Sequence, residues 1–191
     1  VNYRHENIRL KEFATTVAQP PEIKVNHLKF YYQKSTPLFE NLSISVPAGD
    51  QFGIIGKSGT GKSTLLYLIL GILTPREGQI LLSGETCEKF MNNPHNRLGY
   101  VGAEPFLIEG TIKENLSYGN SLSYKDQDYL NALAAVDLKT WAEKQSDCLN
   151  YRLTESGEGL STGQKQRLAL ARALIAQPNL LILDEISANL D

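Results

Sequence analysis

The sequence predicts an α/β fold, and three observations support this prediction. Short runs rich in β-branched and aromatic residues are interspersed with segments of helix-forming composition. A glycine-rich loop stands between an apolar run and a helix-forming run, within residues 54–73. Near the end of the chain, residues 180–183 have the sequence LLIL, which is typical of a strand buried on both faces and therefore of a parallel sheet.

The composition is that of a globular domain with a sizeable core. The chain has 191 residues, of which 41% are hydrophobic and 21% are charged. A net charge of -2 creates no field that would recruit nucleic acid, so we expect no nucleic-acid partner. Two cysteines suggest neither a disulfide framework nor a zinc site. The longest apolar run, residues 65–73, is about half of what a bilayer crossing needs.

The first segment, residues 1–22, is polar, has Gln19-Pro20-Pro21 near its end and is typical of a linker. We expect the domain to cover residues 23–191. Strands are expected at 23–32, 38–46, 51–55, 79–84 and 97–102, helices at 62–73 and about 162–176, and a mostly helical insert at 111–144. Within the insert, the spacing of four residues predicts one buried face: Leu130, Leu133, Ala134 and Leu138.

The glycine-rich loop fits the pattern G-x-x-x-x-G-K-[ST], with an apolar run before it and a helix-forming run after it. Glycines allow successive backbone N–H groups to surround phosphate oxygens, and the helix start adds its positive dipole end. Lys62 would reach the β- and γ-phosphates, and the Ser63 hydroxyl would ligate Mg²⁺. The predicted nucleotide-binding residues of this loop are Gly56, Ser58, Gly59, Thr60, Gly61, Lys62, Ser63 and Thr64.

Two acids follow the LLIL run. Asp184 is the candidate contact for Mg²⁺, and Glu185 is the candidate general base or water-positioning residue beside the γ-phosphate. Acids at the end of an apolar strand are common, so this assignment depends on the presence of the phosphate loop. Together the two motifs predict a P-loop NTPase core with ATP and Mg²⁺ as cofactors.

The sequence Leu160-Ser161-Thr162-Gly163-Gln164, followed by KQRLALARAL and LLILDE, resembles the signature segment of ATP-binding cassette (ABC) ATPases. The closing residues 187–191 resemble the D-loop of that family, and the likeness extends over nearly everything after Val25. In the family, two cassettes pack head to tail, so the resemblance implies that Ser161, Gly163 and Gln164 contact ATP held by a second domain. The alternative reading of this segment is an ordinary capped helix, with Ser161 as the cap.

Further likenesses refine the family assignment. Tyr32 matches the family aromatic that stacks on adenine, and Tyr31 is the alternative. The stretch YVGAEPFLIEGTIKENLSYG, residues 100–119, resembles the exporter type of cassette. Glu155 matches the exporter X-loop acid, which in the family touches the membrane domain; its alternative reading is a solvated loop acid.

Three departures from the family pattern bear on activity. Where the family has a glutamine in its Q-loop, this chain has Ala103 followed by Glu104, and Glu104 is a substitute candidate for the Mg²⁺ contact. Thr162 replaces the first glycine of the signature pair. The family's switch histidine lies beyond the D-loop, and none of the three histidines of this chain stands in its place, so we expect this chain alone to hydrolyse ATP poorly.

The resemblance implies an ABC ATPase fold: a mostly parallel sheet at the core, an antiparallel β subdomain on the N-terminal side, and a helical subdomain at about 104–160. We expect the domain to lack its C-terminal part and the linker to come from an upstream transmembrane domain in the same polypeptide. The implied function is an ATPase that dimerises around two ATP molecules and drives export from the cytoplasmic face of a membrane. The alternatives are a soluble ABC ATPase that clamps nucleic acid or ribosomes, and a regulatory cassette with little turnover.

Overall fold

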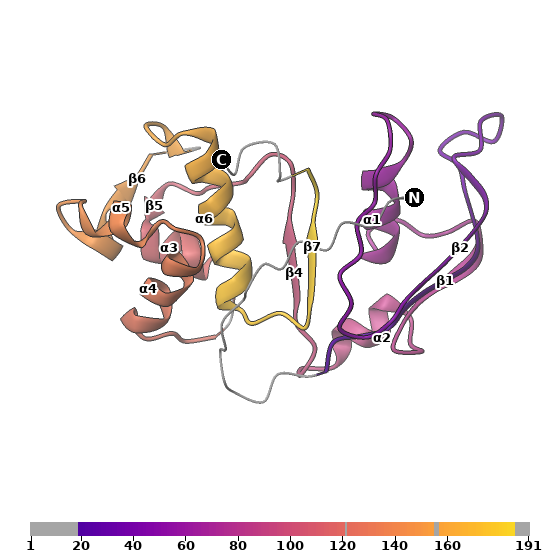
Figure 1. The fold of residues 1–191 in the computed structure, drawn as a ribbon, viewed down its shortest axis with the longest axis horizontal. Coiled ribbons are helices and arrows are strands. Elements are labelled where there is room, and N and C mark those ends of the chain that lie inside the picture. The colour runs from indigo at the N-terminus through magenta and orange to yellow at the C-terminus, as the bar shows by residue number, and fades with distance from the viewer. Residues whose placement is uncertain (1–18, 121, 155–156, 186–191) are drawn as a thin grey trace. The chain divides into compact units, whose positions relative to one another are not determined.

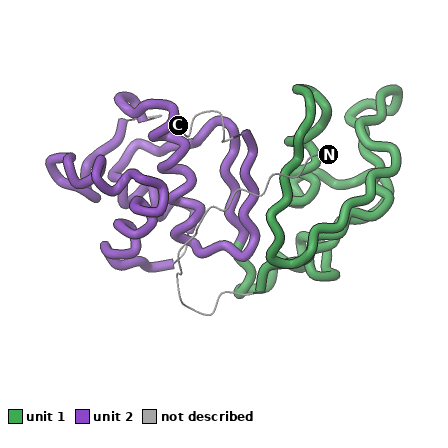
Figure 2. The backbone as a smooth tube through the Cα atoms, viewed as in Figure 1, with its two compact units in different colours: residues 1–9, 14–97 green, residues 10–13, 98–191 purple. Residues whose placement is uncertain are grey.

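The computed structural model describes residues 19–120, 122–154 and 157–185, which fall into two compact units (Figure 2). The first unit comprises the described residues up to Arg97, and the second begins at Leu98. Most of the predicted linker, residues 1–18, lies outside the described residues. The phosphate loop belongs to the first unit, and the signature segment and the two acids belong to the second.

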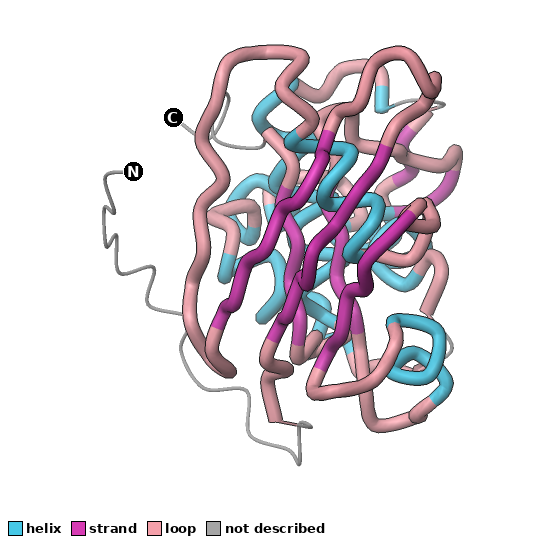
Figure 3. Tube along the Cα trace, turned by 90° about the vertical axis from the view of Figure 1, so that its right-hand side faces the viewer, coloured by secondary structure: helices cyan, strands magenta, loops and turns pink. Residues whose placement is uncertain are grey.

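The first unit contains a three-stranded sheet in the order β2-β1-β3, in which both pairings are antiparallel (Figure 3). Its strands are β1 (Ile23–Phe30), β2 (Phe39–Val46) and β3 (Glu77–Leu82). Ile23 lies opposite Val46 on one side and Leu82 on the other. This sheet is the predicted antiparallel β subdomain.

The central strand β1 is irregular near His27, whose φ is 47°. Its pairings with both neighbours shift register close to this residue. Across from it, Gly78 has a φ of 80°, and a Cβ added there would lie 2.4 Å from the carbonyl oxygens of Asn26 and His27. A glycine is therefore required at the point where β3 passes the irregular part of β1.

Helices α1 (Lys62–Ile69) and α2 (Cys87–Asn92) complete the first unit. Helix α1 is shorter than the predicted 62–73, because Gly71 adopts a φ of 71°. The Ile72 N–H donates to the Tyr67 carbonyl at 2.9 Å, and the Gly71 N–H donates to the Leu68 carbonyl at 3.1 Å. These two bonds form a Schellman motif, which ends the helix before the predicted end at Leu73.

The prediction of a strand at 51–55 is wrong for the described structure. A β-rich composition forms a strand only where a neighbouring backbone accepts its hydrogen bonds. Among the described strands, β1 pairs with β2 and with β3, β4 with β7 and β5 with β6, and none pairs with residues 51–55. Ile55, the last residue of this segment, is 87% exposed.

The second unit contains the parallel pair β4 (Leu98–Val101) and β7 (Leu180–Leu183), with Leu98 opposite Leu180 (Figure 1). The parallel pairing predicted for residues 180–183 is therefore confirmed. A second, antiparallel pair joins β5 (Gly110–Thr111) to β6 (Arg152–Leu153). In the part of the chain that the structure describes, β4 and β7 form the one parallel pairing.

The described part of the second unit contains four α-helices and a short 3₁₀ helix, η1 (Cys148–Asn150). They are α3 (Ile112–Ser117), α4 (Asp126–Ala135), α5 (Lys139–Glu143) and α6 (Thr162–Ile175). Helix α6 has two buried faces. Leu168 and Ala171 belong to the core shared with the other helices, whereas Ala169 and Ala173 pack with Val101 of β4.

The predicted buried face of the helical insert is right in part. Leu133 and Leu138 are buried, and Leu130 is partly buried against the same core. Ala134 is exposed and Ala132 is buried in its place, because α4 (Asp126–Ala135) buries the face that carries Tyr129, Ala132 and Leu133. None of the helices in the described ranges is long and apolar enough to cross a membrane.

Candidate functional site

The phosphate loop closes on its own main chain. Lys62 Nζ donates to the carbonyl oxygens of Gly56 and Lys57, both at 3.1 Å. The Thr60 hydroxyl donates to the Lys57 carbonyl at 2.9 Å, and the Thr60 N–H approaches the same oxygen at 3.4 Å. The Lys62 ammonium thus lies over the loop, at the place that a phosphate group bound by the loop would occupy.

The loop leads into α1 without a side-chain cap. Gly61, the residue at the N-cap position, has a φ of 93° and makes no capping hydrogen bond with a side chain. Gly59 also has a positive φ, of 80°. The first turn of α1 contains Ser63 and Thr64, so its backbone N–H groups and two hydroxyls lie at the positive end of the helix dipole.

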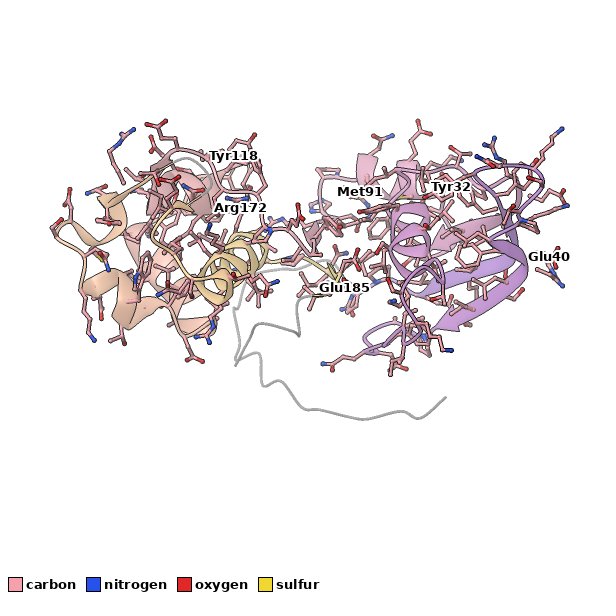
Figure 4. All side chains as sticks on the ribbon, turned by 90° about the horizontal axis from the view of Figure 1, so that it is seen from above. Tyr32, Glu40, Met91, Tyr118, Arg172 and Glu185 are labelled. Atoms are coloured by element: carbon pink, nitrogen blue, oxygen red, sulfur yellow. The ribbon has the colours of Figure 1, made fainter. Side chains whose placement is uncertain are left out.

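Tyr32 lies beside this helix start, in the loop after β1 (Figure 4). Its hydroxyl is 3.1 Å from Thr64 Oγ1, and its ring meets Phe30 edge to face with centroids 5.0 Å apart. The Tyr32 side chain is nevertheless 63% exposed. The rival Tyr31 carries the Arg76 guanidinium over its ring, at 5.3 Å from the centroid. The structure therefore leaves the ring of Tyr32 more available for a planar ligand than that of Tyr31.

Asp184 and Glu185 follow β7 in the second unit. The Asp184 N–H donates to the Val101 carbonyl at 2.8 Å, which extends the β4–β7 pairing by one step. Asp184 is buried and Glu185 is exposed. Glu185 has a φ of 55°, a conformation that a residue with a Cβ adopts only at some cost in energy. The two adjacent acids therefore differ in exposure, with Asp184 buried and Glu185 exposed.

Ala103 and Glu104 leave the carboxyl end of β4, next to the end of β7 that carries the two acids. Both residues are exposed. The Ala103 carbonyl is 3.4 Å from Nε2 of Gln166, a buried side chain of α6. Glu104 is thus placed at the same edge of the parallel pair as Asp184 and Glu185, as ligands at an α/β sheet require.

Ser161 begins α6 with a complete capping box. The Ser161 hydroxyl accepts from the Gln164 N–H at 3.2 Å, and the Gln164 side-chain oxygen accepts from the Ser161 N–H at 2.9 Å. The capped helix of the alternative reading is present, and the cap leaves room for an anion site at the same helix start. The box uses the N–H groups of Ser161 and Gln164, so those of Thr162 and Gly163 and the Ser161 hydroxyl proton remain for a phosphate.

Sequence reasoning missed a cluster around Arg172 and Asn115 in the second unit, where Figure 4 shows Arg172 near Tyr118. The Arg172 guanidinium donates to the carbonyls of Phe106 at 2.7 Å and Asn115 at 2.6 Å, and to Asn115 Oδ1 at 3.1 Å. It also lies 5.5 Å from the centroid of the Tyr118 ring. Burial lowers the pKa of this guanidinium. A single cation within the alanine and leucine run of α6 was the signal available in the sequence.

Asn115 is fully buried and completes this cluster. Its Oδ1 accepts from the Ile108 N–H at 3.0 Å, and its Nδ2 donates to the carbonyls of Ile108 at 2.9 Å and Thr111 at 3.1 Å. Together, Arg172 and Asn115 fasten the loop that follows Glu104 to α3 and α6. The signature helix and this loop are thereby parts of one packed body.

Two of the family assignments cannot be located. Glu155 and residues 187–191, the predicted D-loop, lie outside the described residues. Over the described ranges, no three His, Cys, Asp or Glu side chains gather into a metal cluster.

Comparison with known proteins decides the family. The family described as ABC transporter matches residues 39–188. The chain belongs to the ABC transporter family. It is 33% identical over 170 residues to a multidrug resistance ABC transporter ATP-binding and permease protein of Lactococcus lactis, an alignment that covers 88% of this chain and 29% of the relative.

Two more similarities point to the same group. The chain is 35% identical over 167 residues to the mesentericin-Y105 transport/processing ATP-binding protein MesD of Leuconostoc mesenteroides, covering 87% of this chain and 23% of the relative. It also aligns with the structure of a bacterial Atm1-family ABC exporter with ATP bound, at a TM-score of 0.81 and 29% identity, covering 93% of this chain and 31% of that one. The predicted ABC ATPase fold is confirmed. The chain spans less than a third of the length of these relatives.

Proposed function

We propose that this chain is the ATP-binding and ATP-hydrolysing domain of an ABC exporter. The observation that carries the proposal is the phosphate loop, in which Lys62 lies over the loop carbonyls and α1 begins without a side-chain cap. This open helix start suits a triphosphate. The exporter assignment is supported by the similarity to a structure whose title names an ABC exporter with ATP bound.

ATP binds at the phosphate loop in this proposal. Backbone N–H groups and hydroxyls surround the phosphates, Lys62 moves from its carbonyl partners to the β- and γ-phosphates, and the adenine stacks on Tyr32. The contributing loop residues are Gly56, Ser58, Gly59, Thr60, Gly61, Lys62, Ser63 and Thr64. The exposed Tyr32 ring beside the first turn of α1 supports this arrangement.

Three residues are proposed to hold Mg²⁺: Ser63, Asp184 and Glu104. A hydroxyl and carboxylate oxygens are the hard ligands that Mg²⁺ prefers, and Asp184 and Glu104 follow adjacent parallel strands. When bound, Mg²⁺ would neutralise part of the phosphate charge. Glu104 in place of a glutamine adds a negative charge near the γ-phosphate, so we expect slower turnover than an amide at this position would give.

Glu185 is the proposed general base. Its carboxylate accepts a proton from a water molecule whose oxygen attacks the γ-phosphorus, while the bond from that phosphorus to the oxygen of the β-phosphate breaks. The products are ADP and inorganic phosphate. The exposed position of Glu185 after β7, with its positive φ, supports a role that needs access to a bound ligand.

A second nucleotide-binding domain is the proposed partner at α6. Ser161, Gly163 and Gln164 contact the ATP of that partner, and two ATP molecules are enclosed between the pair. The N–H groups of Thr162 and Gly163, which the capping box does not use, support this contact. A transmembrane domain in the same polypeptide completes the exporter, which places this domain at the cytoplasmic face of a membrane. Residues 23–191 form the nucleotide-binding domain, and its helical subdomain covers about 104–160.

The test uses Glu185→Gln in the full-length protein that carries this domain. The variant should bind ATP with the parental affinity and lose nearly all turnover, because the amide cannot accept the proton of the attacking water. It should also accumulate a nucleotide-bound dimer of the domain, measured by crosslinking the signature segment of one domain to the phosphate loop of the other. Undiminished ATP hydrolysis would remove Glu185 as the base, and loss of binding would assign it to the ATP site instead.

A further inference from the structure

Tyr32 is held by two contacts that leave most of its ring open. Its hydroxyl meets Thr64 Oγ1 at 3.1 Å, and its ring meets Phe30 at an interplanar angle of 88°. Such an edge-to-face contact occupies little of the ring surface. A tyrosine that is 63% exposed would ordinarily sample several rotamers, whereas these two contacts select one of them.

The Thr64 hydroxyl can make two hydrogen bonds at once, one with Tyr32 and one with a phosphate. It lies in the first turn of α1 and is buried, and among the described side chains Tyr32 is the one that meets its hydroxyl. A threonine hydroxyl donates one hydrogen bond and accepts two. When the Tyr32 O–H donates to Thr64, the proton of Thr64 remains available for a phosphate oxygen at the loop.

We propose that Thr64 is a positioning residue for Tyr32, so that one hydroxyl pair connects the phosphate loop to the platform on which the base stacks. This inference rests on the proposed function, in which Tyr32 stacks on adenine. Its new content is that base affinity depends on the Tyr32 hydroxyl, and not only on the ring. Fixing the ring before the nucleotide arrives removes part of the entropy cost of stacking.

The test compares two ligands, MgATP and magnesium tripolyphosphate, because only the first has a base. Their dissociation constants are measured by calorimetry on the full-length protein. The Kd of magnesium tripolyphosphate divided by the Kd of MgATP reports the contribution of the base and ribose. Tyr32→Phe keeps the ring and removes the hydrogen bond, so ATP should bind about three- to tenfold more weakly while tripolyphosphate binding stays unchanged. Thr64→Val should lower the ratio by the same factor, even though it also weakens tripolyphosphate.

The double variant separates positioning from two independent contacts. If the hydroxyls act through each other, the ratio in Tyr32→Phe/Thr64→Val should equal that of either single variant. Tyr31→Phe is the matched control, because it removes a hydroxyl from the adjacent ring, which lies beneath Arg76, and it should leave the ratio at the parental value. Thermal melts of all the variants measure any general loss of stability.

Two results would overturn the inference. A parental ratio in Tyr32→Phe, together with a reduced ratio in Tyr32→Ala, would mean that the ring stacks without help from Thr64. Equal affinity of the parent for ATP and tripolyphosphate, corrected for charge, would mean that no base stacks at all, although the phosphate site would stand. Failure of the proposed function is a different outcome, in which the parent binds neither ligand or Lys62→Ala binds both as well as the parent does.

Discussion

Helix α1 begins at Gly61 with no side-chain cap, whereas α6 begins at Ser161 with a capping box that Gln164 completes. Helix α3 resembles α6, because Thr111 and Glu114 form the same kind of box at its start. A capping box satisfies two backbone N–H groups from within the protein. The open start of α1 leaves that task to a ligand.

This difference shows how the same local structure serves two purposes. A capped start contributes to folding whether or not nucleotide is present, whereas an uncapped start preceded by glycines of positive φ contributes through binding. The first turn of α1 should therefore be stabilised strongly by ATP and that of α6 hardly at all, as long as the second domain is absent. The substitutions that test this contrast follow in order of decreasing effect.

Lys62→Ala has the largest expected effect. It removes the cation over the loop, and the charge-assisted hydrogen bonds that it would make to phosphate are worth about a hundredfold in ATP affinity. Calorimetry with MgATP measures the loss. Lys57→Ala removes an equal charge from the same loop but keeps the carbonyl that receives Lys62, so its loss should be several-fold at most. Equal losses in the two variants would reduce Lys62 to a general electrostatic contribution.

Gly61→Ala attacks the open start itself. Its φ of 93° is strained for alanine, and the added Cβ would lie 2.9 Å from both Leu38 Cδ2 and Phe39 Cζ. We expect a loss of about 1–2 kcal/mol in stability from the backbone term, and a weaker ATP site because the loop must shift. Gly59→Ala is the control, since its φ is 80° and its Cβ would meet no atom within 4 Å. Chemical denaturation should give a lower free energy of unfolding for Gly61→Ala than for Gly59→Ala.

Ser161→Ala opens the start of α6. Losing the cap should cost about 1 kcal/mol, which lowers the Tm by about 2–4 °C in a domain of this size. Ser161→Asp keeps a capping oxygen and should restore most of the stability. Thr162→Ala removes the neighbouring hydroxyl, which is outside the box, and should change the Tm less. If Ser161→Ala melted like the parent, the box would contribute nothing to folding.

The smallest expected effect is a pH dependence of stability that distinguishes α3 from α6. The backbone hydrogen bond from the Thr111 N–H lowers the pKa of the Glu114 carboxyl below its ordinary value of 4.5. A carboxyl whose pKa is lowered by folding stabilises the protein above its unfolded pKa, and this contribution disappears as the pH falls through the folded pKa. The Tm difference between the parent and Glu114→Gln should therefore shrink below about pH 4.5.

Helix α6 provides the converse experiment. Gln164 holds the equivalent position with an amide, which does not titrate. Gln164→Glu should give the start of α6 the acid sensitivity that α3 already has, detected as a new loss of Tm between neutral and acidic pH. A parallel pH profile for the parent and Gln164→Glu would contradict the proposed contribution of the box.

The sequence predicted most elements because their signals are local. The apolar LLIL run, the phosphate loop pattern and the Ser161 cap each depend on a few neighbouring residues, and the structure contains β7, α1 and α6 where these were expected. The end of α1 was misplaced because Gly71 was taken as part of the helix, although it forms the αL turn that ends it. Helix α2 was missed because six residues are too few for a periodic pattern.

Features that depend on distant partners could not be predicted. The strand expected at 51–55 has β-forming residues, but pairing is decided by where another backbone lies. The exposure of Ala134 follows from which face of α4 packs against the core, and that face carries Tyr129, Ala132 and Leu133. The contact between Arg172 and Asn115 joins residues 57 positions apart, and the Tyr32–Thr64 pair joins residues 32 apart. The motifs were therefore readable from the sequence, whereas the hydrogen bonds around them were not.

The Arg172 and Asn115 cluster holds the loop at 102–109 almost entirely by its main chain. Arg172 binds the Phe106 carbonyl, and Asn115 binds both the N–H and the carbonyl of Ile108. Main-chain groups are the same for nearly every amino acid. Substitutions of exposed residues such as Phe106 should therefore leave these bonds intact, whereas Leu107 is buried in the helical core and proline at Ile108 would remove a bonded N–H. The path of the loop is thus set by α3 and α6, while its exposed side chains can vary.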